Sequence, residues 1–230
     1  MNQINKYFLL KIGLISLMIW VIVGALKVVG PAANFPGETS RIMLFHVPQA
    51  WVATLAFFIS MVSSCLYLIK RKLEADYLAN SAAGLGFLFS ILATVTGSIF
   101  AKTTWGSYWN WDPRETSIVM LLMIYGAYFA LRTAIPDRER KRVFSAAYSI
   151  MAFVTVPFLI FILPRMTHSL HPADTMNPSK PGMDNTTLIV FLSSLLAYTG
   201  IFFWMLRLKV RLLKLTEFNQ PTITFFDGAE

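Results

Sequence analysis

Residues 186–206 read TTLIVFLSSLLAYTGIFFWML, a stretch that contains no charged side chain and no proline. A helix needs about 20 mostly apolar residues to cross the hydrocarbon core of a bilayer, so this stretch predicts a transmembrane helix. Five further stretches have the same character, and they cover residues 8–29, 45–69, 78–100, 116–135 and 143–163. The sequence therefore predicts an all-α integral membrane protein with six transmembrane helices.

The composition supports this fold class. Of the 230 residues, 56% are hydrophobic and 14% are charged, whereas about 25% of residues are charged in typical soluble domains. No repeat or linker divides the chain, so we expect a single polytopic domain over residues 1–230. Cys65 is the only cysteine, which excludes an internal disulfide, a CxxC redox centre and a covalent CxxCH haem site.

The positions of lysine and arginine predict the orientation, because loops rich in these residues stay in the cytoplasm. Fourteen of them lie near the termini or in two connections on the same side of the membrane: Lys6, Lys11, Lys70, Arg71, Lys72, Arg132, Arg138, Arg140, Lys141, Arg142, Arg207, Lys209, Arg211 and Lys214. The other six are Lys27, Arg41, Lys102, Arg114, Arg165 and Lys180. Both termini are therefore expected in the cytoplasm, and three outer loops are expected at about 30–44, 101–115 and 164–185.

The net charge of +8 is attributed to these cytoplasmic segments, which face the lipid bilayer, and not to binding of nucleic acid. The charged cluster at 137–142 is interpreted as a solvated turn that faces anionic lipid. Unusual composition is confined to the outer loops, so we expect the function there.

The second outer loop contains a dense aromatic cluster. It includes Trp105, Tyr108, Trp109 and Trp111. Aromatic rings collect at membrane interfaces, so a simple aromatic belt explains any one of these rings. A belt scatters its rings among helix ends, however, and three tryptophans within seven residues favour a platform for a flat, apolar ligand.

The run Asp112-Pro113-Arg114-Glu115 has the pattern of a helix start. Asp112 would be the N-cap, the proline the first helical residue, and Glu115 the capping-box partner. Arg114 would lie in the first turn, where the helix dipole disfavours a cation. We therefore expect Asp112 to anchor the tryptophan loop to the fourth span, and Arg114 to have a specific anionic partner.

All three histidines, His46, His168 and His171, fall on the predicted outer side. One interfacial histidine is usually an ordinary amphipathic residue, but here two separate loops bring imidazoles to the face that carries the tryptophans. Imidazole binds zinc, copper or haem iron, and a structural zinc site needs four ligands, for which the chain lacks cysteines.

Two imidazoles, flat aromatic walls and cations for the propionates together fit haem. Arg41 and Arg114 are the favoured propionate partners, because they adjoin the His46 and tryptophan segments. No span carries a histidine in its interior, whereas membrane subunits that conduct electrons hold haem between helices. A haem held by loops at the outer rim is easier to hand on, which favours haem delivery over electron transport. The spans contain few polar relays, which argues against a channel or transporter.

Two segments resemble the CcmC (haem exporter protein C) family of cytochrome c maturation. The run Trp105-Gly-x-Tyr-Trp-x-Trp-Asp112 resembles the tryptophan-rich WWD signature of haem-handling proteins. Arg41-Ile-Met-x-x-His46-Val-Pro48 is similar to the segment that carries the first haem-ligand histidine of CcmC. The length and the six spans also match, so the resemblance covers nearly the whole chain.

The resemblance implies transient, non-covalent binding of haem b at the outer face of a bacterial inner membrane, between two axial histidines over the WWD loop. Leu170-His171-x-x-x-Thr175 matches the family's second ligand segment better than His168 does, so that role is assigned to His171. The family also implies three partners: the haem chaperone CcmE, the small protein CcmD and the CcmAB ATPase. The protein would then transfer haem and would not be an enzyme.

An alternative remains within the same superfamily. The run Trp111-Asp-Pro-Arg-Glu-Thr116 is closer to the CcsA/CcsB-like proteins of the second maturation system. A haem lyase component of that system, which would catalyse thioether formation, is therefore the second hypothesis.

Overall fold

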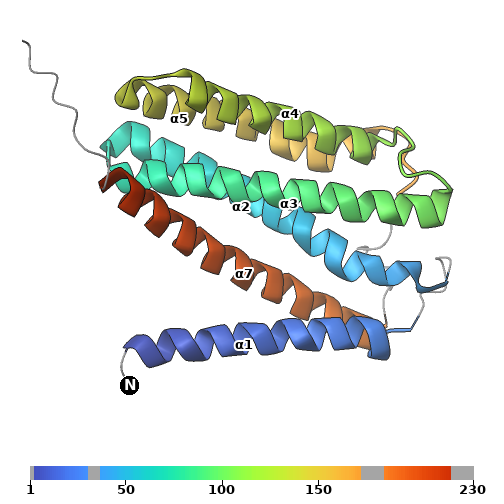
Figure 1. Cartoon of the computed structure of the whole chain (residues 1–230). Helices are drawn as coiled ribbons and strands as arrows, with labels where there is room; N and C mark the ends of the chain where they lie inside the picture. Colours follow the sequence, from blue (N-terminus) through green and yellow to red (C-terminus); the bar gives the residue numbers. More distant parts are fainter. Residues whose placement is uncertain (1–2, 31–36, 172–183, 219–230) are drawn as a thin grey trace, which may run out of the picture.

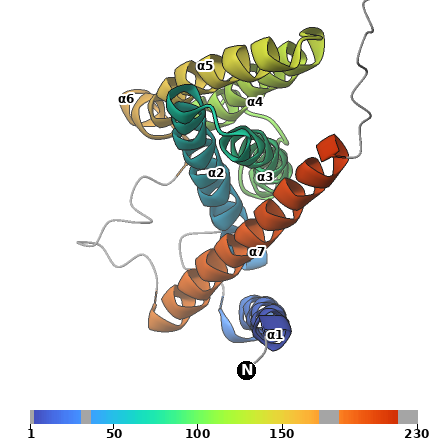
Figure 2. The same cartoon turned by 90° about the vertical axis from the view of Figure 1, so that its left-hand side faces the viewer.

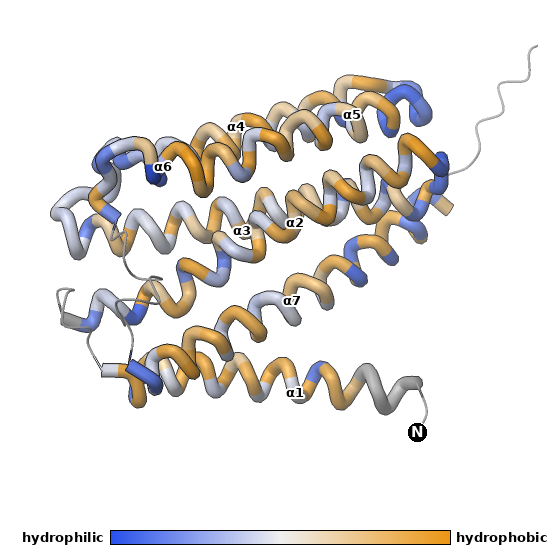
Figure 3. The backbone as a smooth tube through the Cα atoms, turned by 180° about the vertical axis from the view of Figure 1, so that it is seen from behind, coloured by the Kyte–Doolittle hydropathy of each residue, from blue (hydrophilic) through white to orange (hydrophobic). Residues whose placement is uncertain are grey.

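The computed structural model of the protein describes residues 3–30, 37–171 and 184–218, and all regular structure in these ranges is helical. Six helical stretches are long and apolar enough to cross a membrane: Phe8–Val28, Glu38–Lys70, Leu73–Trp105, Pro113–Ala134, Arg138–Met166 and Asn185–Phe218. Hydrophilic residues gather at the two ends of the bundle, and hydrophobic residues fill the part between them (Figure 3). The predicted all-α fold with six spans is confirmed.

The elements follow one another in an up-and-down order. They are α1 (Gln3–Val23), η1 (Gly24–Val28), η2 (Gly37–Ile42), α2 (Met43–Lys70), α3 (Leu73–Trp105), α4 (Pro113–Ala134), α5 (Arg138–Pro157), η3 (Phe158–Ile162), α6 (Leu163–Met166) and α7 (Asn185–Phe218). The α3–α4 loop and the ends of α1, α2, α6 and α7 that flank the other two predicted outer loops meet at one end of the bundle (Figure 1). We call this the tryptophan end.

The centre of the bundle is formed by α2 and α3, which pack along much of their length. Helices α4 and α5 lie on one side of this pair, α7 crosses the other side, and α1 lies outermost against α7 (Figures 1 and 2). The rings of Phe57 and Tyr125 stack in the core with their centroids 3.6 Å apart. The largest buried cluster also includes Val52, Phe89, Leu121, Val156 and Phe202. This packing fixes the helices whose ends carry the predicted site.

Several helices extend beyond the predicted spans. Apolar composition defines the part of a helix that lies in the bilayer, but a helix can continue past this part on either side. Helix α3 begins at Leu73 and ends at Trp105, beyond the predicted 78–100 at both ends. Helix α7 continues to Phe218, past the predicted end at 206, since its basic extension contains no proline or glycine. At Pro157, which lacks an N–H donor, α5 gives way to the π-helical turn η3.

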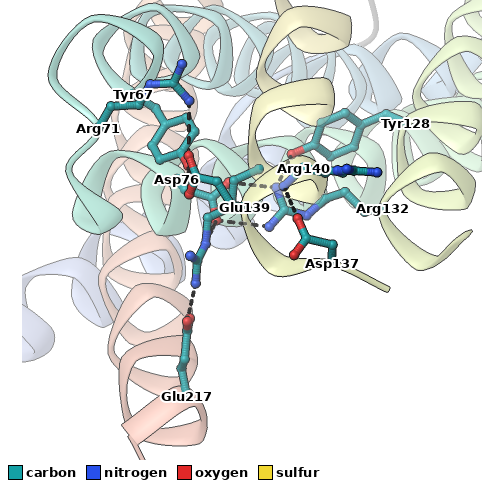
Figure 4. Close-up of polar contacts among 10 residues, drawn as sticks. Tyr67, Arg71, Asp76, Tyr128, Arg132, Asp137, Glu139, Arg140 and Glu217 are labelled. Carbon is teal, nitrogen blue, oxygen red and sulfur yellow. Dashed lines mark hydrogen bonds and ion pairs between the residues drawn. The ribbon is translucent and has the colours of Figure 1, made fainter. Parts of the chain in front are cut away.

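The end opposite the tryptophan end holds an ion-pair network that the sequence did not reveal (Figure 4). Asp76 on α3 is 3% exposed and accepts hydrogen bonds from both terminal nitrogens of Arg132 on α4, at 2.8 and 3.0 Å. Arg142 on α5 pairs with Glu217 on α7, and its Nε lies 3.8 Å from Asp76. The interpretation of residues 137–142 as a solvated turn is therefore wrong for Arg142, whose side chain is only 12% exposed.

Candidate functional site

A cavity of about 360 Å³ lies at the tryptophan end, between α2, α3, α4 and the η3–α6 segment. Most of its wall is apolar, with Val47, Ala50, Trp51, Ile118, Leu159 and Phe161 among the lining residues. Four of the predicted site residues also line it: His46, Trp109, Arg114 and His171. The cavity therefore brings together side chains from three segments that are far apart in the sequence.

His46 lies in the first turn of α2, inside a membrane-spanning stretch. The predicted second span, 45–69, likewise has His46 at its outer end. Its ring packs against Gly97 on α3, where an added Cβ would lie 2.9 Å from His46 Cε1. Only a residue without a side chain leaves room for the imidazole at this crossing.

The Nδ1 atom of His46 lies 3.1 Å from the hydroxyl oxygen of Thr96. This hydroxyl is also 3.2 Å from Oε1 of Gln49, and the Gln49 amide nitrogen donates to the Tyr198 hydroxyl at 3.3 Å. The chain of contacts links α2, α3 and α7 behind the imidazole. It holds one ring nitrogen of His46 and leaves Nε2 available to a ligand.

His171 comes from the third predicted outer loop and is fixed by a carboxylate. Its Nδ1 lies 2.9 Å from Oδ1 of Asp112, and its ring packs edge-on against Trp105 with centroids 4.8 Å apart. Burial lowers the pKa of His171 below its ordinary value, and the neighbouring Asp112 charge opposes this only in part. The imidazole is therefore neutral at pH 7, and donation of Nδ1–H to the carboxylate leaves a lone pair on Nε2.

Asp112 connects the tryptophan loop to this third loop. Its side chain accepts from the backbone N–H of Arg114 at 2.9 Å, and Glu115 closes the predicted capping box, which is confirmed. The same carboxylate accepts from Ser169 Oγ at 3.0 Å and from the Leu170 N–H at 2.6 Å. Burial alone would raise the pKa of Asp112, but the N–H groups of Arg114 and Leu170 and the nearby His171 hold it below its ordinary value. The group is thus a carboxylate at neutral pH.

The remaining aromatic residues of the loop take different positions. Trp109 lines the cavity and meets Trp111 edge-on, with centroids 6.0 Å apart. Trp111 itself is 78% exposed and has a left-handed backbone, with φ of 57°. Tyr108 is also exposed, and the Lys102 ammonium lies 5.5 Å from the centre of its ring. The loop therefore combines one cavity-facing ring with two rings that face outward.

The lysines and arginines predicted on the outer side also take different positions relative to the cavity. Arg114 and Arg165 line the cavity. Arg41 lies on η2, pairs with Glu38 and donates to the Leu26 carbonyl, and it is not among the cavity-lining residues. Lys180 falls outside the described residues, and the exposed His168 does not line the cavity.

Three residues of the site escaped the sequence analysis. Thr96 and Gln49 had no signal beyond being polar within apolar spans, and Gly97 resembled any other helix glycine. Their role depends on the crossing of α2 and α3, which brings Thr96 and Gly97 next to His46. Contacts across 47 to 51 positions cannot be read from a local pattern.

The arrangement suits a flat ligand that contains a metal ion. Two imidazoles face one cavity, each with Nδ1 held by a partner, and this support is typical of histidine ligands. The apolar wall and Trp109 fit a planar ring system, and the two arginines fit acidic substituents at its edge.

Comparison with known proteins identifies relatives over most of the chain. The Heme exporter protein C of Bradyrhizobium diazoefficiens is 30% identical over 202 residues, covering 84% of this chain and 77% of the relative. A mitochondrial CcmC-like protein of Marchantia polymorpha, named for cytochrome c biosynthesis, is 29% identical over 192 residues, covering 82% of this chain and 78% of that protein. The Heme exporter protein C of Paracoccus denitrificans is 33% identical over 133 residues, covering 54% and 55% of the two chains.

The comparison with protein families gives a match over nearly the full length. Residues 2–221 match the CcmC family, described as Heme exporter protein C. The resemblance inferred from the His46 and tryptophan segments is thereby confirmed, and this multi-pass membrane protein belongs to the CcmC family.

Proposed function

We propose that the protein binds haem b non-covalently in the cavity at the tryptophan end and passes it to a haem chaperone during maturation of c-type cytochromes. The observation that carries this proposal is that His46 and His171 line the same cavity from separate elements. Membership of the CcmC family and the names of the relatives point to the same cargo.

In this proposal the iron binds between Nε2 of His46 and Nε2 of His171. Trp109 and the apolar wall cover the porphyrin, while Arg114 and Arg165 pair with the propionates. Arg165 replaces Arg41 as the second cation, because Arg165 lines the cavity, whereas Arg41 does not and pairs with Glu38. The chain's own groups supply binding and orientation, and no covalent bond of the porphyrin is made or broken.

Handover requires a surface that a partner can reach. The exposed rings of Tyr108 and Trp111 lie next to the cavity-facing Trp109 and are available for contact with the chaperone, CcmE in the family's terms. The small protein CcmD and the CcmAB ATPase complete the proposed set of partners. The tryptophan end would face the periplasm of a bacterial inner membrane, since the excess of lysine and arginine lies at the opposite end.

The test is an absorption spectrum of the detergent-purified protein after expression with excess haem. Wild type should show low-spin haem with two histidine ligands, and His46→Ala and His171→Ala should each lose that spectrum and retain less haem. His168→Ala is the matched control, and it should keep the wild-type spectrum because His168 is exposed and does not line the cavity. Wild-type spectra in both His46→Ala and His171→Ala would disprove the assignment of the ligands.

A further inference from the structure

The two imidazoles that line the cavity differ in what holds their Nδ1 atoms. His171 faces a buried carboxylate, Asp112, at 2.9 Å. His46 faces a neutral hydroxyl, Thr96, at 3.1 Å. The two proposed iron ligands therefore have different hydrogen-bond partners on Nδ1, one charged and one neutral.

The surroundings of Thr96 determine which ring nitrogen of His46 carries the proton. Three acceptor oxygens surround the Thr96 hydroxyl: the Leu92 carbonyl at 2.8 Å, the Ala93 carbonyl at 3.2 Å and Oε1 of Gln49 at 3.2 Å. A threonine has a single hydroxyl proton, and it satisfies one of these oxygens. The hydroxyl then accepts from His46, so Nδ1 carries the hydrogen and Nε2 is the nitrogen that can bind iron.

The partner of Nδ1 also sets how strongly Nε2 donates to a metal. A carboxylate draws the Nδ1 proton toward itself and makes the imidazole a stronger ligand. A neutral hydroxyl has a weaker effect, because neutral hydrogen bonds are about half as strong as charge-assisted ones. His171 should therefore hold iron more tightly than His46.

We propose that Thr96 is a positioning residue for His46, and that His46 is the weaker axial ligand and leaves the iron first during handover. The inference rests on the proposed haem site. After His46 leaves, the haem stays on His171, which Asp112 ties to the tryptophan loop with its exposed Tyr108 and Trp111. The cargo thus remains on the loops that a partner can reach and detaches from the helix inside the span.

The experiment measures ligand exchange in the haem-loaded, reduced protein. At saturating carbon monoxide, the rate of CO binding equals the rate at which the labile histidine leaves the iron. Thr96→Val keeps the shape of the side chain and removes the hydroxyl, so this rate should rise about five- to tenfold, as expected for loss of one neutral hydrogen bond. Thr96→Ser restores the hydroxyl and should return the rate to that of wild type.

Thr103→Val is the matched control on the same helix. The Thr103 hydroxyl donates to the Ile99 carbonyl at 3.1 Å, but Thr103 is exposed and does not line the cavity, so the CO rate should stay at the wild-type value. A low-spin ferric spectrum of normal intensity shows that each variant is folded and loaded, and Thr96→Ala replaces Thr96→Val if that variant fails this check.

Two results would overturn the inference. If the CO rate stayed unchanged in the variants that lack the Thr96 hydroxyl, Thr96 would not be a positioning residue for His46. An equal rise in Thr103→Val would show that the rate responds to loss of any α3 hydroxyl and not to the support of His46. These results differ from failure of the proposed function, in which wild type itself shows no haem with two histidine ligands.

Discussion

At the scale of single residues, Asp112 shows how one side chain serves both the fold and the site. As the N-cap it fixes the start of α4, and its remaining lone pairs accept hydrogen bonds from Ser169, Leu170 and His171. Its depressed pKa keeps Asp112 ionised at neutral pH. The carboxylate can therefore hold the third outer loop in place and orient the His171 ring at the same time. The capping role was predictable from four consecutive residues, whereas the contact with His171 spans 59 positions and was not.

Gly97 gives a prediction at the same scale. Gly97→Ala would place a methyl group 2.9 Å from His46 Cε1, so the imidazole must shift. Haem retention should fall about 10- to 100-fold, the range found when the support of a metal ligand is disturbed. Titration of the purified apoprotein with haem, followed by absorption, measures the change.

The control for this prediction is Gly126→Ala on α4. No atom lies within 4 Å of the position of its added Cβ, so haem retention should not change. Helix stability should rise by up to about 1 kcal/mol, since alanine favours a helix more than glycine does. Equal haem retention in Gly97→Ala and wild type would show that His46 does not depend on this contact.

At the scale of helices, the ion pair of Asp76 and Arg132 joins α3 to α4 at the end opposite the site. Both side chains are largely buried, at 4% and 14% exposure. Arg132→Ala removes both hydrogen bonds of the guanidinium to Asp76 and leaves this buried carboxylate only the 3.8 Å ion pair with Arg142, so it should cost up to about 3–5 kcal/mol of stability. Thermal unfolding in detergent should show this loss, while the haem spectrum of the folded variant stays normal because the two features lie at opposite ends.

Arg140→Ala is the matched variant for this test. Arg140 is exposed, and its hydrogen bond to Asp137 uses the backbone N–H, which the substitution keeps. Its effect on stability should stay within about 0.5 kcal/mol. If both arginine variants unfolded at the same temperature, the buried network would have no special role in holding the helices.

The start of α7 gives a prediction for pH. Asp184 accepts from the Thr187 hydroxyl at 2.6 Å and from the backbone N–H groups of Thr187 and Thr186, and these bonds lower its pKa. A group with a depressed folded pKa contributes stability above its unfolded pKa of about 3.9, and loses it as the pH falls through the folded value. Asp184→Ala should therefore cost about 0.5–2 kcal/mol at pH 7, and this difference from wild type should shrink below pH 4.

Asp184→Asn separates the charge from the cap. Asparagine keeps an acceptor oxygen, so the variant should retain most of the stability at pH 7 and show less change toward pH 3. Thermal unfolding of the three proteins across this range provides the measurement. A constant difference between wild type and Asp184→Ala at every pH would contradict the role of the ionised carboxylate.

The limits of prediction also become clear at this scale. Apolar stretches of about 20 residues were enough to find six spans, because the bilayer imposes its thickness on every helix. They did not give the helical extension of α7 to Phe218, because polar residues near a span end leave the helix boundary undefined. The partners of Asp76 were hidden for another reason: three helices, α3, α4 and α5, must pack before Arg132 and Arg142 meet this carboxylate.

At the scale of the whole molecule, the two ends of the bundle have different tasks. The tryptophan end carries the cavity and both of its histidines. The opposite end carries the ion pairs that tie α3, α4, α5 and α7 together. The excess of lysine and arginine at that opposite end predicts that it lies in the cytoplasm and that the cavity opens to the outside.

Single cysteines at the two ends can test this orientation in intact cells. In a Cys65→Ser background, Ser107→Cys places a thiol on the exposed part of the tryptophan loop, and Pro136→Cys places one on the exposed turn between α4 and α5. A membrane-impermeant maleimide should label Ser107→Cys from outside, and should label Pro136→Cys only after the membrane is opened, because a charged reagent does not cross the bilayer. The reverse pattern would put the cavity in the cytoplasm and would contradict the proposed handover of haem at the outer face.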